Sequence, residues 1–360
     1  MKTNNDIKLG VSFYSYQDNL YFQRHDLEGC IAAAAGAGAE GIEVFPETFE
    51  EWPFISDTFV DKWNGMMERY GIEPVCLAHF SDRAMWKNKH LSDDEMFERG
   101  VLYIKAAKKL GCSAIRVMHE EHNAPRSMSG IRLTDYDIIA RLLPIAAENG
   151  VMLALECHSP SSVEDEYQYK YIELAEKTKL PFVGLQSDFS SYEYCITSAE
   201  IVTLVFNGAT REILEYVRSE QRKAYFEGKE LDEEAVAAEV KKMKPNDVDI
   251  KALSKIIPVG KAELSVWTPR KMPFAERYAK LKEYASKIVY VHAKFHNIDE
   301  DGQADNIDYP KIFNCLIEGG YKGYITSEFE GSRRMNMVGW CDEIEYVRKH
   351  HILMRKCLGR

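Results

Sequence analysis

Short apolar runs alternate along this chain with longer amphipathic segments. Runs this short, enriched in β-branched side chains and bounded by polar turns, are typical of strands that are buried on both faces of a parallel sheet. The expected strands are residues 8–13, 41–44, 74–77, 114–118, 151–156, 182–187, 288–292 and 324–328. Eight strands that alternate with amphipathic helices predict an α/β fold, the (β/α)8 TIM barrel, with residues 1–360 in a single domain.

Polar residues and glycines mark where the helices should begin and end. Asp308 is expected to cap a helix whose apolar stripe includes Ile312 and Leu316, and Gly319 follows that helix. The same pattern predicts helices over residues 26–35, 93–110 and 135–147. Each of these helices connects one predicted strand to the next, as the barrel requires.

The regular spacing is interrupted once, between the sixth and seventh strands. The interval is several times longer than one connecting helix needs, and we expect residues 192–265 to form an insertion. Charge-rich helical patterns occupy residues 210–227 and 231–244, and the second is expected to end at Pro245. Loops at this end of a barrel cover the active site, so the insertion is expected to be a lid or a docking element. A solvated elaboration without a catalytic role is the alternative.

Charge and composition narrow the range of functions. Lysine and arginine number 46 against 57 aspartates and glutamates, a net charge of −11, which repels nucleic-acid phosphates and anionic lipid unless a basic patch overrides it. No such patch is apparent, and no stretch approaches the ~18 apolar residues of a membrane span. The cysteines are scattered without a Cys-x-x-Cys pair, which is typical of a reducing compartment. These features predict a cytoplasmic protein that binds neither nucleic acid nor membrane.

The predicted strands end in polar side chains at the edge where barrel enzymes carry their active sites. In chain order these side chains are Tyr14, Glu43, His79, His119, Glu156, Asp188, His292 and Glu328. Acidic and imidazole groups that converge on one axis would repel one another or stay unpaired without a cation. Three carboxylates and one imidazole suit Mn²⁺, Mg²⁺, Zn²⁺ or Co²⁺, so the predicted metal ligands are Glu156, Asp188, His292 and Glu328. Any one of them alone could instead be a salt-bridged or capping residue.

The segments that contain these ligands resemble those of a known superfamily. They read Leu-Ala-Leu-Glu156, Gly184-Leu-Gln-Ser-Asp188, Tyr290-Val-His292-Ala-Lys294 and Tyr324-Ile-Thr-Ser-Glu328, and they are similar to the strand ends of xylose isomerase-like TIM barrels. This superfamily includes sugar isomerases, ketose 3-epimerases, inosose dehydratases and AP endonucleases. The resemblance implies that the four residues hold a divalent metal, commonly Mn²⁺, that binds a carbonyl or a hydroxyl pair of a sugar.

One departure from the superfamily pattern narrows the chemistry. Many of its epimerases and the AP endonucleases carry Asp-x-x-His after the sixth strand, whereas this chain has Asp188-Phe-Ser-Ser191. The missing histidine argues against a trinuclear zinc cluster, and together with the acidic charge it disfavours phosphodiester chemistry. The pattern that remains is that of a mononuclear sugar site.

Three further features resemble a narrower group within the superfamily. They are the Glu156-x-His158 pair, the long insertion, and the segments His292-Ala-Lys-Phe295 and Ser327-Glu-Phe-Glu-Gly331. All three are similar to the large α subunit of bacterial C-glycoside deglycosylases. In that group the barrel pairs with a small β-rich partner subunit and cleaves the carbon–carbon bond between a 3-oxo-sugar and its aglycone. The resemblance implies a hetero-oligomer that acts on a carbohydrate or glycoside.

Such a reaction needs a Lewis acid on the C3 carbonyl oxygen and a base near the neighbouring carbon. Strand residues two apart point to the same side, so His158 is expected to face the mouth of the barrel with Glu156, about 7 Å further along. We predict that His158 removes the C2 proton, after which the aglycone is expelled from C1. His158 could instead orient a neighbouring group, or lie in the loop without a role.

Two other functions remain open. One is a metal-dependent ketose 3-epimerase or sugar isomerase, in which Glu156 and Glu328 would exchange protons from opposite faces of the substrate. The other is a non-catalytic sugar-binding subunit, which the complete set of metal ligands disfavours. The predicted catalytic residues are therefore His158, Glu156 and Glu328. The predicted substrate-binding residues are His119, Lys294, His296 and Arg333.

Overall fold

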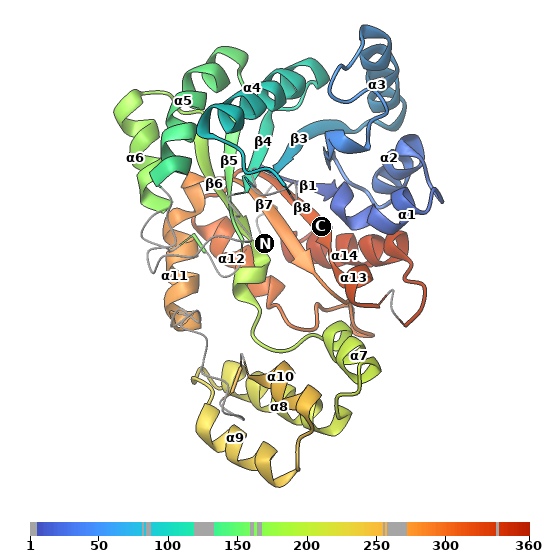
Figure 1. Cartoon of the computed structure of the whole chain (residues 1–360), viewed down its shortest axis with the longest axis vertical. Coiled ribbons are helices and arrows are strands. Elements are labelled where there is room, and N and C mark those ends of the chain that lie inside the picture. Colours follow the sequence, from blue (N-terminus) through green and yellow to red (C-terminus); the bar gives the residue numbers. More distant parts are fainter. Residues whose placement is uncertain are drawn as a thin grey trace.

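Eight strands close into a barrel in the order of the sequence, and each neighbouring pair is parallel (Figure 1). The computed structural model describes residues 6–80, 83, 88–118, 133–158, 162–163, 168–254, 256–257, 272–335 and 338–360. The strands are β1 (Ile7–Ser12), β2 (Gly41–Val44), β3 (Glu73–Phe80), β4 (Ala114–Met118), β5 (Met152–Cys157), β6 (Val183–Asp188), β7 (Ile288–Phe295) and β8 (Gly323–Phe329). The predicted (β/α)8 barrel is confirmed, although β3 and β7 each continue three residues beyond their expected ends.

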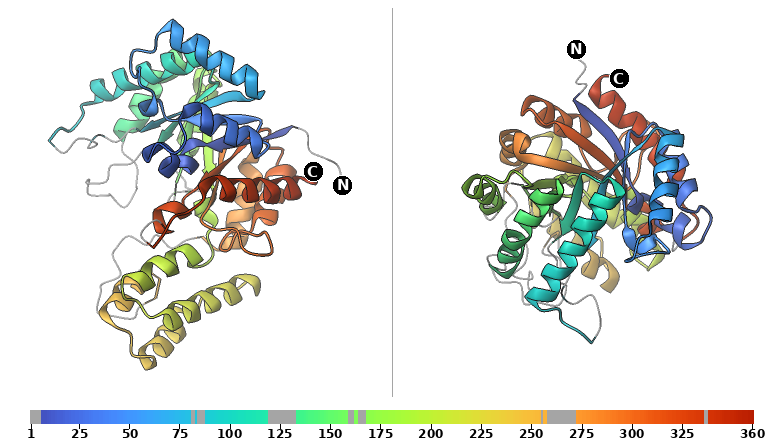
Figure 2. Two further views of the ribbon diagram at one scale, coloured as in Figure 1. Left: turned by 90° about the vertical axis from the view of Figure 1, so that its right-hand side faces the viewer. Right: turned by 90° about the horizontal axis from the view of Figure 1, so that it is seen from above.

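An outer ring of helices surrounds the strands (Figure 2). They are α2 (Leu27–Gly36), α3 (Asp57–Tyr70), α4 (Asp93–Leu110), α5 (Leu133–Asn149), α6 (Tyr169–Thr178), α11 (Phe274–Tyr284), α12 (Tyr309–Glu318) and α14 (Glu343–Leu358), with the short helices α1 (Gln17–Tyr21) and α13 (Gly331–Met335). Side chains cap several of them: Asp26 accepts the N–H of Gly29 at 2.8 Å, and Ser92 with Glu95 forms a capping box at α4. Among the described helices, none combines the length and the apolar character that crossing a membrane requires.

Strand side chains alternate between two apolar environments. Residues that face outward, such as Leu153, pack with the helices in the main core. Residues that face the barrel interior, such as Ala154 and Tyr290, belong to a separate small cluster. Two positions later on the same face of each strand come Glu156 and His292. The barrel interior therefore changes from an apolar layer to a polar layer towards the carboxyl ends of its strands.

The insertion between β6 and β7 is helical and extends from the carboxyl end of the barrel, in the lower part of Figure 1. Its helices are α7 (Ser198–Phe206), α8 (Arg211–Phe226), α9 (Glu233–Lys242) and α10 (Asp247–Leu253). They enclose an apolar cluster of their own, which includes Ile201, Leu214 and Val240. Residues 255 and 258–265 of the predicted insertion lie outside the described residues.

Two of these helices differ from the sequence-based expectation, which placed only α8 and α9. Helix α7 is short and includes Ser198, Glu200 and Thr203 among its apolar residues, and it lacks the charge-rich pattern that located α8 and α9. The second predicted helix ends before Pro245, as expected, but a further helix, α10, begins directly after that proline. The Asn246 side chain accepts the N–H groups of Val248 and Asp249, and Asp249 accepts the N–H of Asn246 in return. A capping box therefore starts a new helix at this point.

A few polar contacts fix the insertion against the loop between β7 and α12. The buried carboxylate of Asp305 accepts the N–H of Ser198 at 2.6 Å and faces the Arg218 guanidinium at 3.2 Å. Arg222 donates to the backbone carbonyl of Asp305 at 2.8 Å. These contacts join the first two helices of the insertion to the rim of the barrel.

Candidate metal centre

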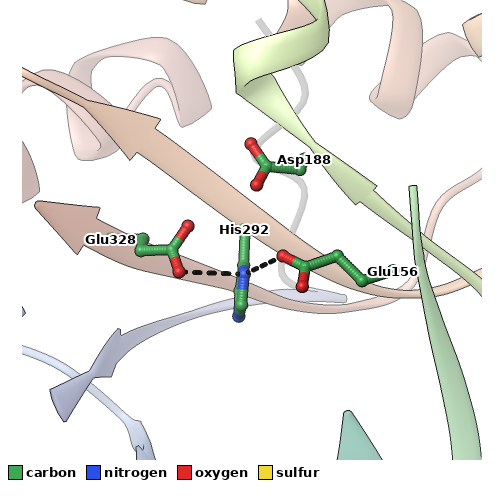
Figure 3. Close-up of side chains that lie close together, drawn as sticks. All are labelled: Glu156, Asp188, His292 and Glu328. Carbon is green, nitrogen blue, oxygen red and sulfur yellow. Dashed lines mark hydrogen bonds and ion pairs between the residues drawn. The ribbon is translucent and has the colours of Figure 1, made fainter. Parts of the chain in front are cut away.

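The four predicted metal ligands converge at the carboxyl end of the barrel (Figure 3). Glu156 lies in β5, Asp188 ends β6, and His292 and Glu328 lie in β7 and β8. One ligand atom of each side chain lies within 4.8 Å of those of the other three, and all four residues are buried. Figure 3 shows the imidazole between the carboxylates of Glu156 and Glu328, with Asp188 to one side. The fold thus brings the whole predicted set together.

A register shift between β6 and β7 sets the height of this cluster. The ladder skips Val289, so β7 carries one additional residue at that point. Asp188 is consequently paired with His292. Without the shift Asp188 would be opposite Val291, whose side chain points to the other face of the strand. The irregularity in the ladder is therefore necessary for the cluster to form.

The His292 imidazole contacts carboxylates through both of its nitrogens. Its Nδ1 lies 2.8 Å from Oε1 of Glu156 and 3.3 Å from Oε1 of Glu328. Its Nε2 lies 2.9 Å from Oε2 of Glu43, at the end of β2. Glu43 in turn accepts a hydrogen bond from the Ser12 hydroxyl at 2.7 Å. The ring therefore spans the barrel interior between the ligand cluster and a carboxylate on the opposite side.

Two buried cations accompany these carboxylates. Arg116 on β4 places Nη1 3.4 Å from Oε2 of Glu156. Lys294 on β7 places its ammonium nitrogen 3.0 Å from Oδ2 of Asp188, 3.2 Å from Oε1 of Glu330 and 3.5 Å from Oε2 of Glu328. Burial raises the pKa of Asp188, and Lys294 only partly offsets that rise. Among the described residues the centre holds more carboxylates than fixed positive charges, so a further cation would be favoured there.

The surrounding charges shift the acid–base behaviour of the ligands. Burial alone would raise the pKa of Glu156, but Arg116 and His292 hold it well below its usual range. The pKa of Glu328 is lowered to about 2 against the effect of burial, because His292 and Lys294 lie beside it. Burial also disfavours a charged His292, yet the three neighbouring carboxylates raise its pKa well above the usual value. Without a metal, a protonated imidazole therefore balances the ligand carboxylates.

This donor set fits a divalent metal. Three carboxylates and one imidazole offer hard oxygen donors with a single nitrogen, the combination that suits Mn²⁺, Mg²⁺, Co²⁺ or Zn²⁺. The ligand atoms already lie close enough to surround one ion. A bound ion would also replace the positive charge that the protonated imidazole supplies in its absence.

His158 lies beside this centre, directly after β5, and it is half-buried. Its Nε2 is 3.0 Å from the Lys294 ammonium nitrogen, which also contacts Asp188 and Glu328. A lysine ammonium group can only donate hydrogen bonds, so Nε2 of His158 must accept. The ring therefore presents an unprotonated nitrogen next to the ligand cluster.

The other predicted substrate-binding residues occupy different surroundings. His296, just beyond β7, places Nε2 2.8 Å from Oε1 of Glu193 at the start of the insertion. Arg333 in α13 is exposed, donates to Oε1 of Gln17 at 3.2 Å and lies over the Tyr14 ring at 4.7 Å. His119 lies outside the described residues. Among the described residues of this group, only Lys294 contacts the metal ligands.

Sequence reasoning assigned no role to three charged residues of this centre, Glu43, Arg116 and Glu330. Arg116 had the clearest signal, because it interrupts the apolar strand Ala-Ile-Arg-Val-Met. A charged side chain in the middle of a buried strand needs a partner of opposite charge. Glu43 was recognised as a strand end, but nothing in its short strand indicates that its partner is His292.

Comparisons with known proteins agree with this architecture. A family model described as xylose isomerase-like TIM barrel matches residues 31–356. The chain is 26% identical to the C-glycoside deglycosidase alpha subunit of Arthrobacter globiformis over 354 residues, 98% of this chain and 92% of that protein. It is 24% identical to the 3'-dehydrocarminate deglycosidase alpha subunit of a Microbacterium species, with 98% and 95% covered. The D-psicose 3-epimerase structure with D-tagatose from Clostridium cellulolyticum H10 has a TM-score of 0.54 at 13% identity, with 98% and 99% covered, and shares the fold.

Proposed function

The chain belongs to the xylose isomerase-like TIM barrel family, and we propose that it is a divalent-metal-dependent lyase that cleaves the carbon–carbon bond of 3-oxo-C-glycosides. Relatives named as deglycosidase alpha subunits align with nearly the whole chain and support this substrate class. The observation that carries the proposal is the accepting Nε2 of His158 beside the ligand cluster. The proposed reaction needs a proton acceptor beside the metal, and this nitrogen would supply it.

In the proposed enzyme, Glu156, Asp188, His292 and Glu328 hold the metal, for which we expect Mn²⁺, with Mg²⁺, Co²⁺ and Zn²⁺ as alternatives. When bound, a divalent ion here acts as a Lewis acid on the C3 carbonyl oxygen and makes the neighbouring C–H bond more acidic. Arg116 and Lys294 keep the carboxylates oriented from either side through their ionic contacts.

His158 acts as the base. Lys294 donates one N–H to Nε2 and retains others for Asp188 and Glu330. When substrate displaces that first hydrogen bond, the Nε2 lone pair is free to take the C2 proton. The electron pair of the C2–H bond forms a C1=C2 double bond, the bond from C1 to the aglycone breaks, and the aglycone carbon takes up a proton. The products are the free aglycone and an unsaturated 3-oxo-sugar.

We also propose that the chain works with a second subunit. The relatives named above are each described as an alpha subunit, and a small β-rich partner is the expected counterpart. We expect the complex to act in the cytoplasm.

A metal-dependent ketose 3-epimerase is the second candidate, because one geometric feature favours it. Glu156 and Glu328 flank the His292 ring from opposite sides (Figure 3). Two carboxylates arranged in this way could exchange a proton with the two faces of one carbon. In that reaction His158 would not be required for proton transfer.

The two functions are separated by supplying both kinds of substrate. The purified chain, combined with its partner subunit and Mn²⁺, is incubated with a 3-oxo-C-glucoside and separately with free ketoses. We expect aglycone release, and a loss of about 10²- to 10⁴-fold in His158→Ala at unchanged metal content. His351→Gln, which changes a buried histidine that faces the Gly10 carbonyl, is the control and should retain activity. Ketose epimerisation without aglycone release, retained in His158→Ala, would overturn the lyase proposal.

A further inference from the structure

Glu43 is a fully buried carboxylate that is not one of the four clustered ligands, yet it contacts one of them. Both of its oxygens lie near Nε2 of His292, at 2.9 and 3.1 Å. The Ser12 hydroxyl, from the paired position on β1, donates to Oε1 at 2.7 Å. This serine orients the carboxylate, and the carboxylate faces the side of the imidazole that points away from the cluster.

The orientation of the imidazole determines which nitrogen can bind a metal. Nδ1 faces Glu156 and Glu328, so a metal held by these residues would take the Nδ1 lone pair. A neutral imidazole then carries its one proton on Nε2, where only an acceptor can satisfy it. Glu43 is that acceptor. A ring flipped about the Cβ–Cγ bond would place carbon atoms at both positions and lose both sets of contacts.

We propose, on the basis of the metal centre described above, that Glu43 is a positioning residue that fixes the Nε2–H tautomer and the ring orientation of His292. Through this hydrogen bond the carboxylate on β2 makes Nδ1 a stronger metal ligand on β7. Groups that hold the second nitrogen of a ligating histidine typically change metal affinity by about 10- to 100-fold when they are removed. The Tyr290 ring, edge-on to the imidazole at 5.7 Å, packs beside the ring and does not replace this hydrogen bond.

The test compares two substitutions that differ in what they offer to Nε2. Glu43→Gln keeps the shape and an amide oxygen that can accept, but it removes the charge. Glu43→Leu has a similar volume and no acceptor. Glu343→Gln is the matched control, because Glu343 is equally buried but accepts from Asn19 and the Asp18 backbone instead of His292. Affinities for Mn²⁺ and Zn²⁺ are measured by competition with a chelator.

We expect Glu43→Leu to weaken metal binding by about 10- to 100-fold, Glu43→Gln by less, and Glu343→Gln not at all. In the zinc-loaded wild type, ¹⁵N NMR of the histidine side chains should show one ring with a ligated Nδ1 and a protonated, slowly exchanging Nε2. That proton should exchange faster in Glu43→Gln. These readouts report on the metal and the tautomer, whereas a space-filling role of Glu43 would change only thermal stability.

The possible failures are distinguishable. If wild type binds the metal and both Glu43 variants bind it equally well, the positioning role is wrong while the metal centre stands. If wild type takes up no divalent ion, the metal centre itself is wrong, and the role of Glu43 falls with it. If Glu43→Leu does not fold, Glu43→Gln still tests the inference. An unchanged metal affinity in this variant, together with an unchanged exchange rate of the Nε2 proton of His292, would contradict it.

Discussion

The barrel and the insertion of α7 to α10 place their functional residues by different means. In the barrel, the parallel ladder fixes the height and the direction of every side chain, so that Glu156 and Glu328 meet at one imidazole. In the insertion, the helices pack around an apolar cluster of their own. They contact the barrel through Asp305 and through Tyr225 of α8, which bonds to Tyr278 and Asp308 and packs against Phe274.

This difference determines which contacts position the side chains in each region. In a barrel, the order of the strands determines which residues lie beside a given strand end, whatever the length of the chain between them. A helix in an insertion meets the barrel through a few side-chain contacts with segments that can lie far away in the sequence. Changes to the polar residues at the carboxyl ends of the strands should therefore affect the metal centre directly. Changes in the insertion should first affect its contacts with the barrel.

The largest effect is expected from Asp188→Asn, which removes charge from the metal centre. The amide retains the oxygen that accepts the N–H of Ser190 at 2.7 Å, so the local backbone should be preserved. Without the negative charge, metal affinity should fall by more than about 100-fold, beyond the range typical for groups that only hold a ligand. Metal content after dialysis and chelator competition measure this change.

The matched control lies in the insertion. Asp249 is equally buried and accepts from the backbone and hydroxyl of Thr210, far from the four ligands in sequence. Asp249→Asn should leave metal affinity unchanged and lower only the local stability of the insertion. Equal metal affinity in Asp188→Asn and wild type would contradict the proposed centre.

Much of the barrel was predictable because its signals are local. Apolar runs located the strands, and capping residues such as Asp308 located the helices. The end of β7 was misplaced because Lys294 looks like the first polar residue of a loop. Its burial depends on Asp188, Glu328 and Glu330, which are supplied by other strands and loops. A lysine can remain inside a barrel only when such partners are present, and a local pattern does not report them.

At the metal centre, too, local sequence patterns did not reveal contacts between distant residues. The four ligands were predictable because each one comes at the expected end of a strand and their residue types suit one metal. The role of Glu43 was not, since its partner His292 is 249 positions away in the chain. In the insertion, helix α7 was missed because it lacks the charge-rich pattern of α8 and α9. What the sequence left open at the metal centre is a contact between distant segments.

A smaller effect, confined to the insertion, is expected from Asp305→Ala. The substitution leaves the Ser198 N–H and the Arg218 guanidinium without their buried acceptor. We expect a loss of about 1 to 3 kcal/mol in the stability of the insertion, the usual cost of an unsatisfied buried polar group. Hydrogen exchange should become faster in α7 and α8 and stay unchanged in the barrel strands. Glu300→Ala, an exposed change in the same loop, is the control; faster exchange throughout the barrel would show that the two regions unfold as one unit.

The smallest effect is a pH dependence that belongs to the barrel alone, because residues 192–265 contain no histidine. Burial lowers the pKa of His351 to about 3, whereas the unfolded chain titrates near its ordinary value of about 6.5. Between these two values the unfolded state binds a proton that the folded state does not, so stability falls as the pH drops below about 6.5. The slope for one such group is about 1.4 kcal/mol per pH unit.

His351→Gln tests this assignment, because its amide can still donate to the Gly10 carbonyl. Between pH 6.5 and 5, the free energy of unfolding of the metal-free variant, measured with urea, should fall less steeply than that of wild type. The exposed His90→Gln should behave like wild type, and equal slopes in all three proteins would contradict this assignment.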